Sequence, residues 1–170
     1  MRSSINPLLN ILLVFLLLFS VKPLFGAAEQ AAQDPILPQP NAELQPGDVV
    51  QIVIDALASN DLPFRDAGIE TTFNFASPSN KLQTGPLQNF TKLLKGPAYS
   101  QMLNHRDSTL SEVILDDNKA IRLVQIISES NQTLYFAFRL GLQKQGNYSG
   151  MWLTEAVWQM DNPSGDVVAL

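Results

Sequence analysis

Glu155 has the most promising setting for acid–base chemistry in this sequence, because Trp152 and Trp158 flank it in an alternating stretch. A carboxylate buried among apolar groups has a raised pKa and can act as a general acid or base. The alternative is a structural role on the outer face of a sheet, either exposed or paired with Arg122 or Arg139. We favour the structural role and keep Glu155 as a catalytic candidate.

His105 is the second catalytic candidate and the single histidine of the chain. It lies in the polar stretch 103–107, where it is either a general base or, the interpretation we favour, a surface or capping residue. The chain has no cysteine, so thiolate nucleophiles, thiolate metal sites and disulfides are excluded. Asp116 and Asp117 lack the spacing of a calcium loop and favour a hairpin turn. We therefore predict no metal and no cofactor.

Two sets of residues are candidates for ligand binding. Ser77, Asn80 and Thr84 bring short hydrogen-bonding side chains to the segment between two expected helices, where they would line the mouth of a pocket. Caps and turns are the competing role, since these residue types commonly serve there. Phe136 and Phe138 are candidates because they belong to the apolar face of an alternating strand.

Composition narrows the class of partner. The chain of 170 residues has a formal net charge of -5 and only 16% charged residues, against about 25% in typical soluble domains. Nucleic-acid binding needs clustered Lys and Arg to replace phosphate counterions, and no such block is present. Nucleic acid is therefore excluded as an expected partner.

The N-terminus predicts export across a membrane. Arg2 precedes an apolar run over 8–19, and small residues follow at Gly26 to Ala28, the pattern of a secretory signal over 1–28. The destination would be the periplasm, a thylakoid lumen or the extracellular space. The alternative is an uncleaved anchor that contacts the membrane through residues 8–25, because apolar residues continue past the central run.

Three further segments follow. Residues 29–45 are rich in Pro, Gln and Ala and read as an extended linker. Residues 46–161 have the size of one domain, and 162–170 form a C-terminal tail.

Hydrophobic periodicity predicts helices first and strands afterwards in the domain. Asp48 is expected to cap the first helix with Gln51, two helices follow over 69–76 and 86–94, and 99–103 form a short apolar turn. Four strands are expected over 109–115, 121–127, 134–142 and 151–160. Strict alternation in the last strand would place Glu155 on one face with Val157 and would place Thr154 on the other. The expected fold class is α+β, with N-terminal helices packed on an antiparallel four-stranded sheet.

The order Phe75-Ala76-Ser77-Pro78-Ser79-Asn80, then Thr84-Gly85-Pro86, then an apolar helix with Phe90 resembles an uncharacterised domain family of bacteria, cyanobacteria and plants. That family looks like a member of the cystatin-like, cone-shaped superfamily typified by nuclear transport factor two and ketosteroid isomerase. The resemblance implies a curved sheet that wraps around a helix and encloses a cavity. It implies no activity, because the superfamily includes enzymes, ligand binders and interaction modules.

Our leading hypothesis is an exported, non-catalytic cone domain that binds a small apolar ligand or a protein partner, and a homodimer is possible. The first alternative is an isomerase or dehydratase-like enzyme with Glu155 or His105 as base. The second is a membrane-tethered envelope scaffold, which requires an uncut signal.

The expected secretory signal predicts where the mature chain begins. Cleavage after Ala28 is expected to give an exported protein whose first residue is Glu29, because small side chains occupy the two positions that signal peptidase reads. Intact mass and N-terminal sequencing of the exported protein measure this. A mass that retains residues 1–28 would favour the anchor.

Overall fold

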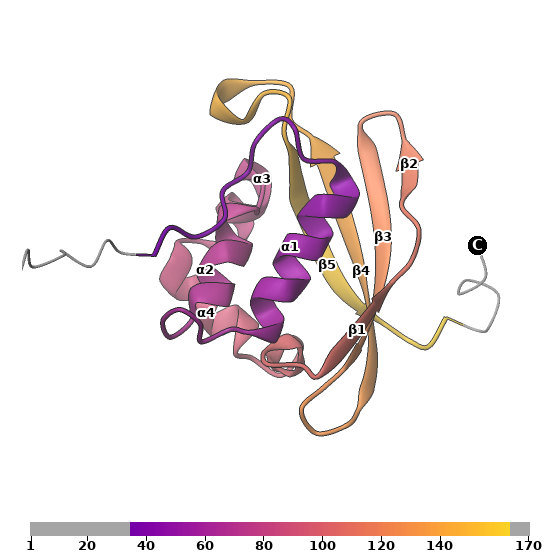
Figure 1. The fold of residues 1–170 in the computed structure, drawn as a ribbon. Coiled ribbons are helices and arrows are strands. Elements are labelled where there is room, and N and C mark those ends of the chain that lie inside the picture. The colour runs from indigo at the N-terminus through magenta and orange to yellow at the C-terminus, as the bar shows by residue number, and fades with distance from the viewer. Residues whose placement is uncertain (1–34, 164–170) are drawn as a thin grey trace, which may run out of the picture. The chain divides into compact units, whose positions relative to one another are not determined.

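The computed structural model describes residues 35–163, and these form an α+β domain, as the sequence predicts. Figure 1 shows the helices gathered on one face of a single antiparallel sheet. The helices are α1 (Pro46–Ala58), α2 (Ala67–Asn74), α3 (Pro78–Thr84) and α4 (Leu87–Leu94), followed by the short 3-10 helix η1 (Ser100–Met102). The strands are β1 (Asp107–Leu110), β2 (Ile114–Asp116), β3 (Lys119–Ile127), β4 (Thr133–Leu142) and β5 (Trp152–Met160), and the 3-10 helix η2 (Gly146–Tyr148) precedes β5.

Helix α1 begins earlier than its sequence pattern indicates. Gln45 is the N-cap, and the Asp48 carboxylate accepts a hydrogen bond from the Gln45 backbone N–H at 2.9 Å. The prediction that Asp48 itself caps the helix with Gln51 was therefore wrong. Pro46 is responsible, because its fixed φ suits the first helical position and its missing N–H costs nothing there.

Helix α3 occupies a segment for which the sequence predicts a connection between two helices. Ser77 is its N-cap, with Oγ accepting from the Asn80 backbone N–H at 3.1 Å, and Pro78 follows at the first helical position. The same Ser-Pro pair that reads as the end of one helix is thus the start of the next.

The sheet has five strands in place of the expected four. Its order is β1-β3-β4-β5, and β2 pairs with the other half of β3. The predicted single strand 109–115 is interrupted because residues 111–113 face only two residues of β3, between the pairs Leu110–Val124 and Ile114–Ile121. Ser111 fixes the interruption, since its side-chain oxygen accepts from the Leu123 backbone N–H at 3.0 Å.

Strand β5 contains a β-bulge that overturns the expected alternation. Arg139 pairs with Ala156 and Leu140 pairs with Thr154, which leaves Glu155 without an opposite residue. The extra residue reverses the order of faces along the strand. Thr154 and Val157, which strict alternation put on opposite faces, therefore both lie on the face that packs against the helices.

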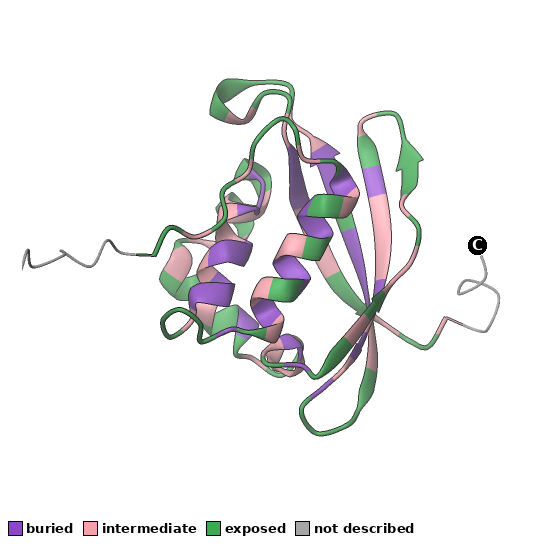
Figure 2. Ribbon diagram, viewed as in Figure 1, coloured by how far each residue is buried: buried purple, intermediate pink, exposed green. Residues whose placement is uncertain are grey.

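The core lies between the helical layer and the sheet, and Figure 2 shows buried positions facing each other across it. Helix α1 contributes its apolar face, and β4 contributes Phe136, Phe138 and Leu140, each 1% exposed or less. Among residues 35–163, none of the helices combines the length and the apolar character that a membrane span requires. The expected signal, the start of the linker and residues 164–170 lie outside the described residues. Linker residues 35–45 contain a turn but no helix or strand, and Leu44 packs against the core.

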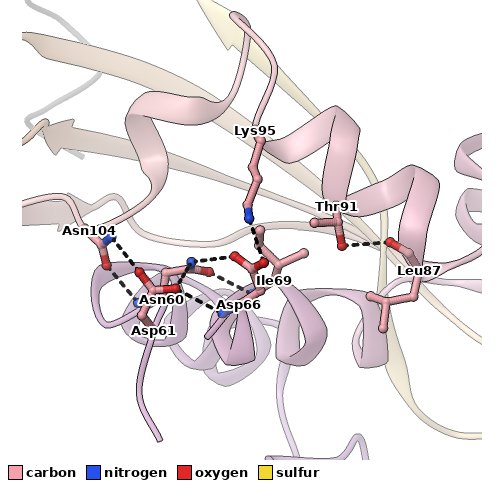
Figure 3. Close-up of polar contacts among 8 residues, drawn as sticks. All are labelled: Asn60, Asp61, Asp66, Ile69, Leu87, Thr91, Lys95 and Asn104. Carbon is pink, nitrogen blue, oxygen red and sulfur yellow. Dashed lines mark hydrogen bonds and ion pairs between the residues drawn. The ribbon is translucent and has the colours of Figure 1, made fainter. Parts of the chain in front are cut away.

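A polar network around Asn60, drawn in Figure 3, joins the helices to the connection before the sheet. The buried Asn60 side chain accepts from the Ile69 backbone N–H at 3.1 Å and donates to Asp61 and Asp66. The Asn60 backbone N–H donates to the side chain of Asn104 at 3.1 Å. Because a buried polar group without a partner is costly, this network fixes where α2 starts relative to α1.

Asp66 is the charged member of the network. Burial alone would raise its pKa, but hydrogen bonds from Lys95 and Asn60 and the charges of Lys95 and Arg65 outweigh burial and hold the pKa below its ordinary value. The Lys95 ammonium lies 2.6 Å from the Asp66 carboxylate. The ionised carboxylate therefore stabilises the folded state.

This lowered pKa predicts a pH dependence. A group with a depressed folded-state pKa adds stability above its unfolded-state pKa, near 4, and that stability is lost as the pH falls through the folded-state pKa. Asp66→Asn should lower the free energy of unfolding at pH 7 by about 1 kcal/mol or less, since the ion pair is partly exposed. Denaturant unfolding from pH 7 to pH 2 should show the two stability curves converging in acid.

Asp161→Asn, a change at an exposed carboxylate after β5, is the control and should leave the wild-type curve unchanged. An Asp66→Asn difference that stays constant down to pH 2 would contradict the role assigned to the ionised carboxylate.

Candidate functional site

A cavity of about 210 Å³ lies between the helical layer and strands β4 and β5. Its wall is mostly apolar, with side chains from α1, α4, η1 and the sheet that include Val53, Leu57, Leu94, Met102 and Phe138. The cavity is partly open to solvent, because the exposed residues Gln83 and Leu93 belong to its wall. Small-molecule sites are concave and mostly apolar with a few polar groups, so this cavity is the leading candidate for a binding site.

Thr154 belongs to the cavity wall and carries a fully buried hydroxyl. Its side chain is 4% exposed, and its Oγ1 has no hydrogen-bond partner among the described residues. The backbone holds it firmly, because the Thr154 N–H donates to the Phe75 carbonyl and its carbonyl accepts from the Ser77 N–H, both at 2.9 Å. Ala76 forms a parallel bridge with Thr154 at the same place.

The other hydroxyls in the wall already donate to backbone carbonyls. Thr72 donates to Gly68 at 2.8 Å, Thr84 to Asn80 at 3.0 Å and Tyr99 to Val157 at 2.9 Å. Thr154 thus differs from them in keeping its proton uncommitted.

The structure separates the three polar ligand-binding candidates. Asn80 and Thr84 line the cavity, and the Asn80 amide also donates to the Glu155 carbonyl at 3.2 Å. Ser77 is fully buried, acts as the N-cap of α3 and is absent from the cavity wall. The competing role that the sequence offered, a cap, is the one that Ser77 fills.

The two phenylalanine candidates are also separated. Phe138 lines the cavity. Phe136 packs against the ring of Tyr99, with ring centroids 6.5 Å apart, and borders a second hollow near Leu110 and Met160.

Glu155 has its carboxylate on the sheet face opposite the cavity. Oε1 lies 2.6 Å from Lys119 Nζ, and Oε2 lies 3.5 Å from Arg139 Nε. A Cβ placed on Gly141 would overlap this carboxylate, so the group lies over Gly141, next to Leu140, whose side chain points the other way into the core. Glu155 reaches the cavity wall without directing its charge into it, and the Arg139 pairing foreseen from the sequence is present.

His105 lies away from the cavity. Its ring is buried, 5% exposed, and Nδ1 is 2.8 Å from the Met102 carbonyl oxygen. The expected surface position was wrong, but this contact has the capping character that the sequence indicated. Within residues 35–163, no three His, Cys, Asp or Glu side chains lie close enough together to hold a metal ion.

Sequence reasoning missed Thr154 as a site residue. A threonine in a strand is ordinary, and only the β-bulge places this one on the sheet face that packs against the helices. The available signal was Gly141, because a glycine inside a strand often marks a bulge or a close approach.

The fold and site define a cysteine-free α+β domain with an apolar cavity under its helical layer. No protein-family model, curated protein or solved structure matches the chain.

The contact between Gly141 and Glu155 predicts non-additive stability effects. Gly141→Ala should force the carboxylate away from Lys119 and Arg139 and lower the free energy of unfolding by about 1 kcal/mol. In a Glu155→Ala background the same change should be neutral or stabilising, because alanine restricts the unfolded chain more than glycine does. Denaturant unfolding of the four proteins measures the coupling. Additive effects would contradict the predicted contact.

Proposed function

We propose that the domain is a non-catalytic binding module for a small, largely apolar ligand held in the cavity beneath the helices. The observation that carries this proposal is the cavity itself, about 210 Å³ with a mainly apolar wall. Cavities lined by apolar side chains bind apolar molecules of matching size, and an engineered cavity of about 150 Å³ takes up benzene. The expected ligand is therefore somewhat larger than benzene.

The exposed part of the cavity wall offers a ligand a route of entry, which supports the proposed binding. Leu93 and Gln83, which are both exposed, belong to the cavity wall. They come from α4 and α3, so the cavity opens between these two helices. The two helices are short, and no side chain of α3 is fully buried, which makes this edge the easiest part of the helical layer to displace.

The contacts of the two catalytic candidates favour binding over acid–base chemistry. A general base needs an accessible atom within hydrogen-bond reach of the substrate proton. Both carboxylate oxygens of Glu155 face cations on the opposite side of the sheet, and His105 contacts the backbone outside the cavity.

Export and the cone resemblance complete the proposal. The order of helices before an antiparallel sheet is compatible with the cystatin-like superfamily, and we propose that the domain is exported behind its N-terminal segment as a member of that superfamily. In this view the cavity is the interior of the cone.

Toluene is a suitable first probe. It should bind reversibly and shift the NMR signals of methyl groups in the wall, such as those of Leu57 and Leu94, because the wall is apolar. Val53→Phe, which fills the cavity from α1, should weaken toluene binding about tenfold or abolish it.

Ile52→Phe is the matched control, since Ile52 neighbours Val53 on α1 and does not line the cavity. It should bind toluene as the wild type does. Wild-type protein whose wall methyl signals do not respond to toluene would refute the proposed function.

A further inference from the structure

We infer that α3 is a lid over the cavity and that Lys81 is the latch that holds this lid closed. The role of the lid depends on the proposed function, because the lid controls access to the same cavity. The latch is the contact that must break before a ligand passes between α3 and α4.

Helix α3 covers the cavity without being part of the core. Asn80, Gln83 and Thr84 belong to the cavity wall. No residue of α3 is buried, and Leu82 is 86% exposed. Segments with few buried apolar contacts open locally at a low cost in free energy. Displacement of α3 would therefore remove one side of the cavity while the core between α1 and the sheet stays packed.

The two ends of α3 limit how it can move. Ser77, its N-cap, is fully buried, and the Ser77 backbone N–H donates to the Thr154 carbonyl at 2.9 Å. At the other end Gly85 has a φ of +79°, a left-handed conformation that glycine adopts without strain, and it joins α3 to Pro86, the N-cap of α4. Motion of the lid is thus confined to the residues between Ser77 and Gly85.

Lys81 ties the middle of α3 to its surroundings. Its Nζ lies 5.0 Å from the centroid of the Phe73 ring and 5.3 Å from that of the Tyr148 ring, and it donates to the Asn74 carbonyl at 3.3 Å. Phe73 and Asn74 belong to α2, whereas Tyr148 belongs to η2, in the loop between β4 and β5 that lies beside α3 in Figure 1. One ammonium group therefore holds α3 to two separate elements.

The attraction at this latch is electrostatic and weak enough to break reversibly. Lys81 forms no ion pair with a carboxylate among residues 35–163, and its charge is attracted by the electron-rich faces of the two rings. Such a contact at an exposed site changes an equilibrium roughly two- to fivefold. The Asn80 amide adds one hydrogen bond from α3 to the sheet, to the Glu155 carbonyl at 3.2 Å. Neutralising Lys81 should therefore increase the open population without unfolding the domain.

A latch of this kind controls rates more than affinity. It is closed in the free protein, and it closes again once the ligand lies inside, so breaking it costs the same in both states. Loss of the latch should speed entry and exit by the same factor and leave the dissociation constant nearly unchanged.

Thiol labelling measures the opening directly, because the chain has no cysteine of its own. Val53→Cys introduces one thiol in the cavity wall, at a position 1% exposed, and its reaction with dithionitrobenzoate is followed by absorbance. Val50→Cys, on the same helix, fully buried and outside the wall, reports unfolding of the core. Each is measured with Lys81 intact and with Lys81→Gln or Lys81→Arg, at low urea concentrations.

Val53→Cys should react faster than Val50→Cys and at a rate nearly independent of urea, because opening a lid exposes little surface. Lys81→Gln should raise this rate roughly three- to tenfold, since it removes the charge and keeps the helix propensity of the side chain. Lys81→Arg retains the cation and should react at the wild-type rate.

Three results would overturn the inference. A Val53→Cys rate that rises with urea as steeply as that of Val50→Cys would mean that the cavity opens only when the core unfolds. An unchanged rate in Lys81→Gln would remove the latch. A rate in Lys81→Arg as high as in Lys81→Gln would show that the charge is not what holds the lid.

Toluene exchange distinguishes the lid from the proposed function. Where toluene binds, Lys81→Gln should raise its association and dissociation rates, measured by NMR, by the same factor as the labelling rate. A change confined to the dissociation constant would overturn the latch. Failure of toluene to bind, with labelling as expected, would refute the proposed function and leave the lid and its latch in place.

Discussion

The architecture depends on a short backbone pairing between the helical layer and β5, an edge strand of the sheet. Thr154 in β5 donates to Phe75 and accepts from Ser77, each at 2.9 Å, and these are the residues that join α2 to α3. The pairing satisfies part of the free edge of β5, which otherwise exposes unpaired backbone groups. It also sets how far the helices stand from the sheet, and the cavity occupies the space that remains.

The β-bulge at Glu155 decides which residue of β5 lies on the cavity side of the sheet. Without the extra residue, the pairing of Val157 with Phe138 would leave position 155 on the cavity side and a carboxylate in an apolar pocket. With it, Thr154 takes that place and the carboxylate lies over Gly141 between two cations. A single inserted residue thus keeps a costly buried charge out of the apolar cavity wall.

The two ends of the helical layer differ in how many buried contacts hold them. The Asn60 network ties α1, α2 and the segment before β1 together through hydrogen bonds that are buried or partly buried. Helices α3 and α4, at the mouth of the cavity, bury few side chains of their own. The end of the layer formed by α1 and α2 is thus held by more buried contacts than the end formed by α3 and α4. This difference is consistent with the proposal that a ligand enters between α3 and α4 while the core stays packed.

Local sequence signals determined the α+β class and most of the elements. The apolar stripe of α1 and the alternation in β4 are properties of neighbouring residues, so they can be read without knowing the fold. The exclusion of thiolate chemistry and disulfides was equally local, because the absence of cysteine can be read directly from the sequence. Errors came where contacts distant in sequence override local preference: Ser111 splits a strand through its bond to Leu123, and the Asn80 side chain binds the backbone of Glu155.

Only the tertiary structure decided the candidate site. The sequence pointed to Asn80, Thr84 and Phe138, which line the cavity, and also to Ser77, Phe136 and His105, which do not. It passed over Thr154, because alternation fixes the face of a side chain only while the register is unbroken. Pairing with β4 places the bulge in β5, and that pairing joins residues that the chain alone does not bring together. The sequence therefore determined which side chains exist and which elements they form, while the register between strands decided which residues of β5 line the cavity.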